Sequence, residues 1–200
     1  MSFHPLMMYD QRFQKSERKI ADEGPAFTFT PERRAQLDDV VSKYPPDQKR
    51  SAVLAALYLL QDQQGYLTAN GMRHVAAVLD MTPAEVEDVA TYYVMFYKEP
   101  VGKHVLQVCR TLSCALLGAE RVTEALSEKL GLKVGETDES GLFTLLEFEC
   151  LGACDRAPIV MVNNEHWHEH ATPESCSKLV DDIKARGIDA LSGCHLEVER

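Results

Sequence analysis

Four of the six cysteines in this chain of 200 residues occur as two closely spaced pairs. Cys109 and Cys114 form a C-x4-C pattern, and Cys150 and Cys154 form a C-x3-C pattern. A thioredoxin-type redox dithiol needs C-x-x-C, and neither pair has that spacing. Thiolates are also the ligands of structural zinc and of iron–sulfur clusters. The two pairs therefore predict a metal centre.

Two kinds of metal centre are consistent with four cysteines. Zinc sites usually pair cysteines by short knuckles, and a zinc ribbon would join its pairs by a shorter hairpin than the 35 residues that separate these two. A [2Fe–2S] cluster is larger than one ion, takes four cysteine ligands and suits the wider spacing. Gly152, inside the second pair, would let backbone N–H groups approach such a cluster. Four buried structural thiols are the third interpretation.

The second half of the chain contains the elements that must position these cysteines. Its patterns predict two strands joined by a helix, then a hairpin and a last helix. The expected strands cover residues 104–109, 142–148, 159–162 and 166–170, and the expected helices cover residues 115–130 and 172–186. This order predicts a thioredoxin-like α/β domain over residues 103–186. In that layout the two cysteine pairs follow neighbouring strands at the same end, so four thiols would converge.

The first half reads as a helical bundle over residues 30–98. Thr30-Pro31 and Thr82-Pro83 combine an N-cap with proline at the first helical position, and Gly65 is a C-cap. Four helices are expected, over residues 31–44, 51–64, 68–79 and 82–96. Residues 1–29 are interpreted as an arm that orders on a partner or not at all, and residues 187–200 as a tail without a core-forming pattern. The fold class is therefore α+β, an N-terminal helical bundle followed by a thioredoxin-like domain.

Composition and charge exclude several classes of protein. The chain is 45% hydrophobic and 26% charged, as in ordinary globular proteins. Its formal charge is −10, and residues 101–200 carry −7 of it. Such a surface repels phosphate backbones and anionic lipid, so nucleic acid and the bare membrane are poor partners. The longest apolar run, Ala52 to Leu60, is too short to span a bilayer, and no targeting segment is recognisable. We expect a bacterial cytoplasmic protein whose cysteines stay reduced.

The cysteine segments also carry a family resemblance. The segments V-C-R-T-L-S-C at residues 108–114 and E-C-L-G-A-C at residues 149–154, with Ala157-Pro158, resemble the thioredoxin-like [2Fe–2S] subunit of respiratory complex I, the family of E-type subunits of NADH:quinone oxidoreductase. The helical stretch at residues 89–96 and the sequence P-V-G-K at residues 100–103 resemble it as well. The resemblance covers about residues 30–186, and nothing is carried over to the arm or the tail.

The resemblance implies an electron-transfer protein without a substrate site of its own. Cys109, Cys114, Cys150 and Cys154 would hold one [2Fe–2S] cluster, which exchanges single electrons with the flavin of a partner NADH-oxidising subunit. FMN and NADH would bind to that flavoprotein partner and not to this chain. The complex, with its other peripheral-arm subunits, would place the chain at the inner face of the bacterial membrane. The same module occurs in soluble NAD-linked hydrogenases and formate dehydrogenases, which form the alternative.

Three further features are functional candidates. His166, His168 and His170 alternate along one expected strand, which suggests either a metal site or, as we expect, the solvent face of the hairpin. Cys176 lies on an apolar helical stripe and is expected in the core, whereas Cys194 is expected on a mobile tail. The helices joined by residues 80–82 resemble a helix-turn-helix, the mark of a metal-sensing DNA-binding regulator. Acidic residues at the start of the second helix disfavour that hypothesis.

Overall fold

The computed structural model describes residues 23–191, and the chain divides between Pro100 and Val101 into two compact units. The first unit is helical, and the second combines helices with a four-stranded mixed sheet. The predicted α+β class is confirmed.

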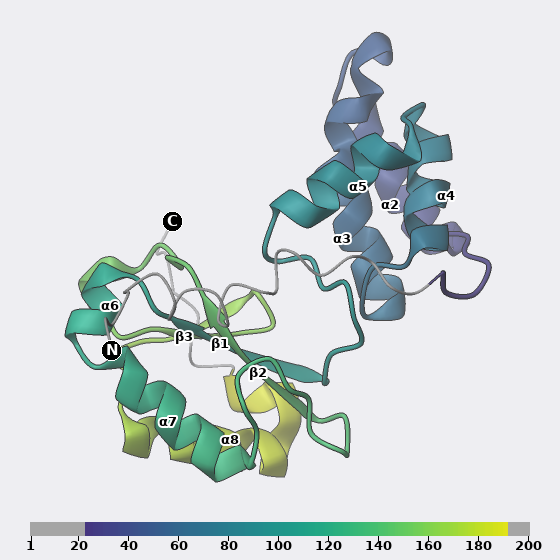
Figure 1. Cartoon of the computed structure of the whole chain (residues 1–200). Helices are drawn as coiled ribbons and strands as arrows, with labels where there is room; N and C mark the ends of the chain where they lie inside the picture. The colour runs from purple at the N-terminus through teal and green to yellow at the C-terminus, as the bar shows by residue number, and fades with distance from the viewer. Residues whose placement is uncertain (1–22, 192–200) are drawn as a thin grey trace, which may run out of the picture. The chain divides into compact units, whose positions relative to one another are not determined.

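The first unit is a small bundle of helices around one apolar core (Figure 1). Its elements are α2 (Pro31–Ser42), the 3-10 helix η2 (Pro46–Ala52), α3 (Val53–Gln64), α4 (Ala69–Leu79) and α5 (Pro83–Tyr92). The side chains of Thr30 and Thr82 cap α2 and α5 as predicted, and Gly65 ends α3 in the left-handed conformation. These capping signals are local, which is why the sequence alone locates the helix starts.

Two expectations for the first unit are wrong. Helix α5 ends at Tyr92 and does not continue to Phe96, because Tyr93 adopts an extended backbone conformation. Residues 23–29 belong to the bundle and not to an arm: Phe29 is buried in the core, and Glu23 pairs with Arg73 of α4 at 2.5 Å. Residues 1–22 of the expected arm lie outside the described residues.

The second unit is built on the sheet order β2-β1-β3-β4. The strands are β1 (His104–Cys109), β2 (Phe143–Phe148), β3 (Val160–Val162) and β4 (His166–His168). Strands β1 and β2 are parallel, and the pairs β1/β3 and β3/β4 are antiparallel. The helices are α6 (Leu112–Leu116), α7 (Ala119–Leu130) and α8 (Pro173–Arg186), of which α7 and α8 lie side by side along the sheet (Figure 1). This is the thioredoxin-like layout expected from the sequence.

Three details of the second unit differ from expectation. The single helix predicted over residues 115–130 is broken into α6 and α7 at Gly118, whose φ of 99° no helical residue adopts. Strand β4 ends at His168. The tail contributes to the core, since Leu191 at the end of the 3-10 helix η4 (Gly187–Leu191) is fully buried. Residues 192–200 lie outside the described residues.

Within residues 23–191, no helix combines the length and the apolar composition needed to cross a membrane.

Candidate metal centre

The first cysteine pair is held by regular structure and is buried. Cys109 is the last residue of β1, where its N–H donates to the carbonyl of Ile159 at 3.0 Å. Cys114 lies in α6. The exposed fractions of Cys109 and Cys114 are 2% and 1%. This half of the candidate site is therefore fixed by the core of the second unit.

The second cysteine pair lies in a loop and is exposed. Cys150 follows the end of β2, and Cys154 begins the three-residue 3-10 helix η3 (Cys154–Arg156). The two sulfur atoms are 3.4 Å apart. Gly152 has a φ of 81°, a conformation that other residues rarely adopt, and its N–H lies 3.5 Å from Cys150 Sγ. The glycine is thus required by the turn that directs a backbone donor at a thiol.

The parallel pairing of β1 and β2 brings these two segments to the same end of the sheet. Cys109 pairs in register with Phe148, two residues before Cys150. Arg110, the next residue of the first segment, donates its N–H to the carbonyl of Phe148 and its guanidinium to Glu149 at 2.8 Å. The two cysteine segments therefore lie side by side at this end of the sheet.

The thiols are close enough to change one another's acidity. Burial, together with a hydrogen bond to Cys109, raises the pKa of Cys114 to about 12, and the charges of Cys109 and Cys154 add to this rise. The hydrogen bond with Cys150 and the charge of Cys150 raise the pKa of Cys154, and the charge of Cys109 contributes. In contrast, the N–H of Gly152 lowers the pKa of Cys150. The cysteines of the two segments therefore influence one another's charge, and a bound cation would stabilise their thiolate forms.

Two hydroxyl residues of the first segment take part in the site, and the sequence reasoning missed them. The side chain of Thr111 lies 3.3 Å from Cys109 Sγ, and its hydrogen bond to Cys150 lowers the pKa of that thiol. A hydrogen bond with Ser113 partly offsets the rise in the pKa of Cys154. Both residues lie between the two cysteines of the C-x4-C pattern, and this position in the sequence could have indicated that they contact the site.

The donor set fits an iron–sulfur cluster. Four thiols converge from two segments, with N–H and O–H donors directed at their sulfur atoms, and such donors stabilise thiolate charge. Across residues 23–191, no three His, Cys, Asp or Glu side chains gather closely enough to hold one metal ion, whereas a [2Fe–2S] cluster would divide its four cysteine ligands between two irons.

The remaining candidates have other surroundings or lie outside the described residues. His166 is buried and His168 is half-buried with its Nε2 2.9 Å from Ser175 Oγ, so the expected solvent face of the hairpin was wrong for both. The hydrogen bond directs His168 toward the first turn of α8. Cys176 is fully buried in the core as predicted, and burial raises its pKa to about 11. Cys194 lies outside the described residues.

The comparisons with known proteins agree with this geometry. The family model "Thioredoxin-like [2Fe-2S] ferredoxin" matches residues 37–184. The E-type subunit of the NADH-quinone oxidoreductase of Rickettsia bellii is 40% identical over 159 residues, which cover 79% of this chain and 95% of that relative. The corresponding protein of Mycobacterium tuberculosis strain H37Rv is 38% identical over 167 residues, which cover 82% of this chain and 65% of the relative.

A solved structure has a similar fold. The crystal structure of an NAD+-reducing [NiFe]-hydrogenase in the H2-reduced state matches with a TM-score of 0.60 at 18% identity, covering 69% of this chain and 24% of that one. At this identity the match concerns the fold alone. The family resemblance of the cysteine segments is confirmed by the family model and by the curated relatives. The chain therefore belongs to the thioredoxin-like [2Fe–2S] ferredoxin family, among the E-type subunits of NADH-quinone oxidoreductase.

Proposed function

We propose that this chain is the electron-transfer subunit of an NADH:quinone oxidoreductase and that Cys109, Cys114, Cys150 and Cys154 hold its one [2Fe–2S] cluster. The observation that carries the proposal is the parallel register of β1 and β2, which ends at Cys109 and Phe148 and sets the two cysteine segments side by side. When bound, the cluster accepts and returns one electron at a time.

The residues of the chain then have distinct tasks. Cys109 and Cys114, which are buried, would hold the cluster from the core, and Cys150 and Cys154, which are exposed, would hold it from the loop. The N–H of Gly152 and the hydroxyls of Thr111 and Ser113 donate to thiolate sulfur and stabilise its charge. Exposure of one ligand pair leaves a face through which an electron-transfer partner can approach closely.

The partner that we propose is a flavoprotein subunit that binds FMN and NADH. Leu112 and Leu116 support a docking surface near the cysteines, since they are 75% and 78% exposed on the same short helix as Cys114. The complex, with its other peripheral-arm subunits, would hold this chain at the inner face of the bacterial membrane. We also propose that residues 30–98 dock the flavoprotein while residues 103–186 hold the cluster.

A diaphorase subunit of a soluble NAD-linked hydrogenase or formate dehydrogenase is the alternative. The likeness to a hydrogenase is at 18% identity, whereas the relatives from NADH-quinone oxidoreductase reach 40%. Sequence identity therefore favours the complex I assignment.

Serine variants of the cysteines test the proposed ligand set. In purified full-length protein loaded with iron and sulfide, Cys109→Ser, Cys114→Ser, Cys150→Ser and Cys154→Ser should each lose most of the visible absorption. A serine hydroxyl is a poorer ligand for iron than a thiolate, so the cluster becomes unstable. The controls are Cys176→Ala and Cys194→Ala, which should keep the iron content and the colour of the unaltered chain.

Two results would overturn the ligand assignment. Loss of colour in Cys176→Ala would mean that the four ligands include a cysteine other than those proposed. A colourless unaltered protein that contains stoichiometric zinc would exclude the cluster itself.

A further inference from the structure

The two halves of the metal centre are supported in different ways. Cys109 and Cys114 are buried within β1 and α6. Cys150 and Cys154 are exposed, and the segment that holds them, residues 149–157, contains only the three-residue helix η3 as regular structure. A loop of this kind keeps two sulfur atoms in place only if contacts from elsewhere fix its backbone.

One such contact comes from Trp167, the only tryptophan of the chain. Its indole N–H donates to the carbonyl oxygen of Leu151 at 3.1 Å. Leu151 directly follows Cys150, and Trp167 lies in the edge strand β4. Both side chains are partly buried and pack against the core of the second unit. The hydrogen bond therefore ties the beginning of the exposed loop to the sheet.

A second set of contacts fixes the other end of the loop. Arg156, two residues after Cys154, binds both carboxylate oxygens of Glu169 through its Nη1 at 2.9 and 2.8 Å. The N–H of His170 donates to the carbonyl of Arg156 at 2.8 Å. Glu169 and His170 directly follow β4, so one segment, residues 167–170, holds the loop on both sides of its cysteines.

We propose that Trp167 and Glu169 are positioning residues for the exposed ligands Cys150 and Cys154. Trp167 fixes the carbonyl that follows Cys150, and Glu169 fixes the arginine that follows Cys154. The inference rests on the proposed function, and it assigns to β4 and the residues after it a role in retaining the cluster. A chelator would reach the cluster from the side of the exposed Cys150 and Cys154, so the rate at which this loop opens would set the rate at which iron is lost.

The test measures how fast cluster-loaded full-length protein loses its visible absorption in excess EDTA. Trp167→Phe keeps an aromatic ring and removes the N–H donor, and Glu169→Gln removes the charge that binds Arg156. Each change should speed bleaching about threefold to tenfold, the range expected when one hydrogen bond that closes the loop is lost. The EPR lines of the reduced variants should also be broader, because the sulfur positions become less uniform.

Asp181→Asn is the matched control. Asp181 of α8 pairs with Lys129 of α7 at 2.8 Å, so this variant also breaks an acid–base pair of the second unit, but away from the cysteine loop. It should bleach at the rate of the unaltered protein and keep its EPR line width. If Trp167→Phe does not fold, Glu169→Gln decides the outcome by the same two measurements.

Two results would overturn the inference. One is bleaching of both variants at the unaltered rate with unchanged EPR lines. The other is an equal acceleration in Asp181→Asn, which would show a general loss of stability and no specific role of the loop. Failure of the proposed function would look different, because the unaltered protein would then take up no colour at all.

Discussion

Charged residues of both signs lie beside the thiols, and they should affect reduction of the cluster in opposite ways. Arg110 directly follows Cys109, and its guanidinium lies 2.8 Å from Glu149 and 3.9 Å from Glu147. Glu149 in turn directly precedes Cys150. Reduction of the cluster adds a negative charge, so a neighbouring carboxylate opposes it and a neighbouring guanidinium favours it. The two members of this ion pair should therefore shift the reduction potential in opposite directions.

Glu149→Gln should raise the reduction potential of the cluster by roughly 20 to 60 mV. The estimate takes one unit charge at the edge of the protein, where water and salt screen most of the interaction. An optical redox titration of the loaded protein measures the shift. Glu139→Gln is the control, because Glu139 precedes the far end of β2, about 20 Å of strand away, and should change the potential little. A fall in potential in Glu149→Gln, or an equal rise in both variants, would contradict the electrostatic explanation.

At the scale of the elements, signals that act locally were readable from the sequence. The caps of α2, α4, α5 and α8 are threonine side chains that bind N–H groups three residues later, so a few letters predict them. The bounds of β1 and the convergence of both cysteine pairs were predicted as well, because parallel strands joined by a crossover end on the same side.

Features that depend on tertiary packing could not be predicted from the local sequence. The apolar period of residues 115–126 runs without interruption through Gly118, and only the left-handed backbone there separates α6 from α7. His166 was expected on the solvent face of the hairpin because the sequence offers no fourth ligand for a histidine metal site, yet its side chain is buried. Leu191 lies in a tail whose apolar residues follow no helical or strand period, so the local sequence does not predict that it completes the core. The ties from β4 to the cysteine loop involve residues 13 and 16 positions apart, beyond any local pattern.

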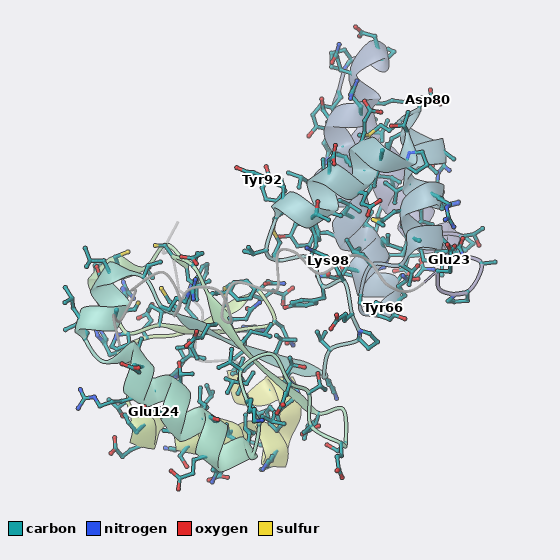
Figure 2. The ribbon with its side chains drawn as sticks, viewed as in Figure 1. Glu23, Tyr66, Asp80, Tyr92, Lys98 and Glu124 are labelled. Atoms are coloured by element: carbon teal, nitrogen blue, oxygen red, sulfur yellow. The ribbon has the colours of Figure 1, made fainter. Side chains whose placement is uncertain are left out.

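The end of α5 is the element that we expect to dock the flavoprotein. Tyr92 is 79% exposed and projects away from the helix (Figure 2), and Tyr93 packs edge-on against it with ring centroids 5.0 Å apart. Exposed aromatic side chains of this kind often carry much of the energy of a protein interface. Tyr92→Ser should weaken binding of the flavoprotein at least about tenfold, measured by calorimetry, without loss of colour.

Tyr44→Ser serves as the control for this prediction. Tyr44 is also an exposed tyrosine of the first unit, but it follows α2 and lies outside the α5 segment. Its replacement should leave binding unchanged. If Tyr92→Ser binds the flavoprotein as tightly as the unaltered chain, the flavoprotein docks on another surface. The exposed leucines of α6 would then be tested first.

At the scale of the whole molecule, the chain combines a helical unit with a thioredoxin-like unit, and its charge is distributed unequally between them. Residues 101–200 carry −7 of the net −10. These acids disfavour an added electron, and the absence of a histidine from the proposed ligand set removes the usual means of raising the potential of a [2Fe–2S] centre. We therefore expect a carrier of low potential, which fits the proposed exchange of single electrons with a flavin.

An EPR-monitored redox titration of the loaded full-length protein tests this account most directly. We expect no EPR signal from the oxidised protein and a signal of about one spin per chain after reduction. The intensity of this signal should follow the curve of a single one-electron reduction. Its midpoint should lie near the roughly −400 mV of all-cysteine plant-type centres. A protein that gives no signal on reduction, or a midpoint above about −150 mV, where Rieske centres begin, would contradict a four-cysteine [2Fe–2S] cluster in this environment.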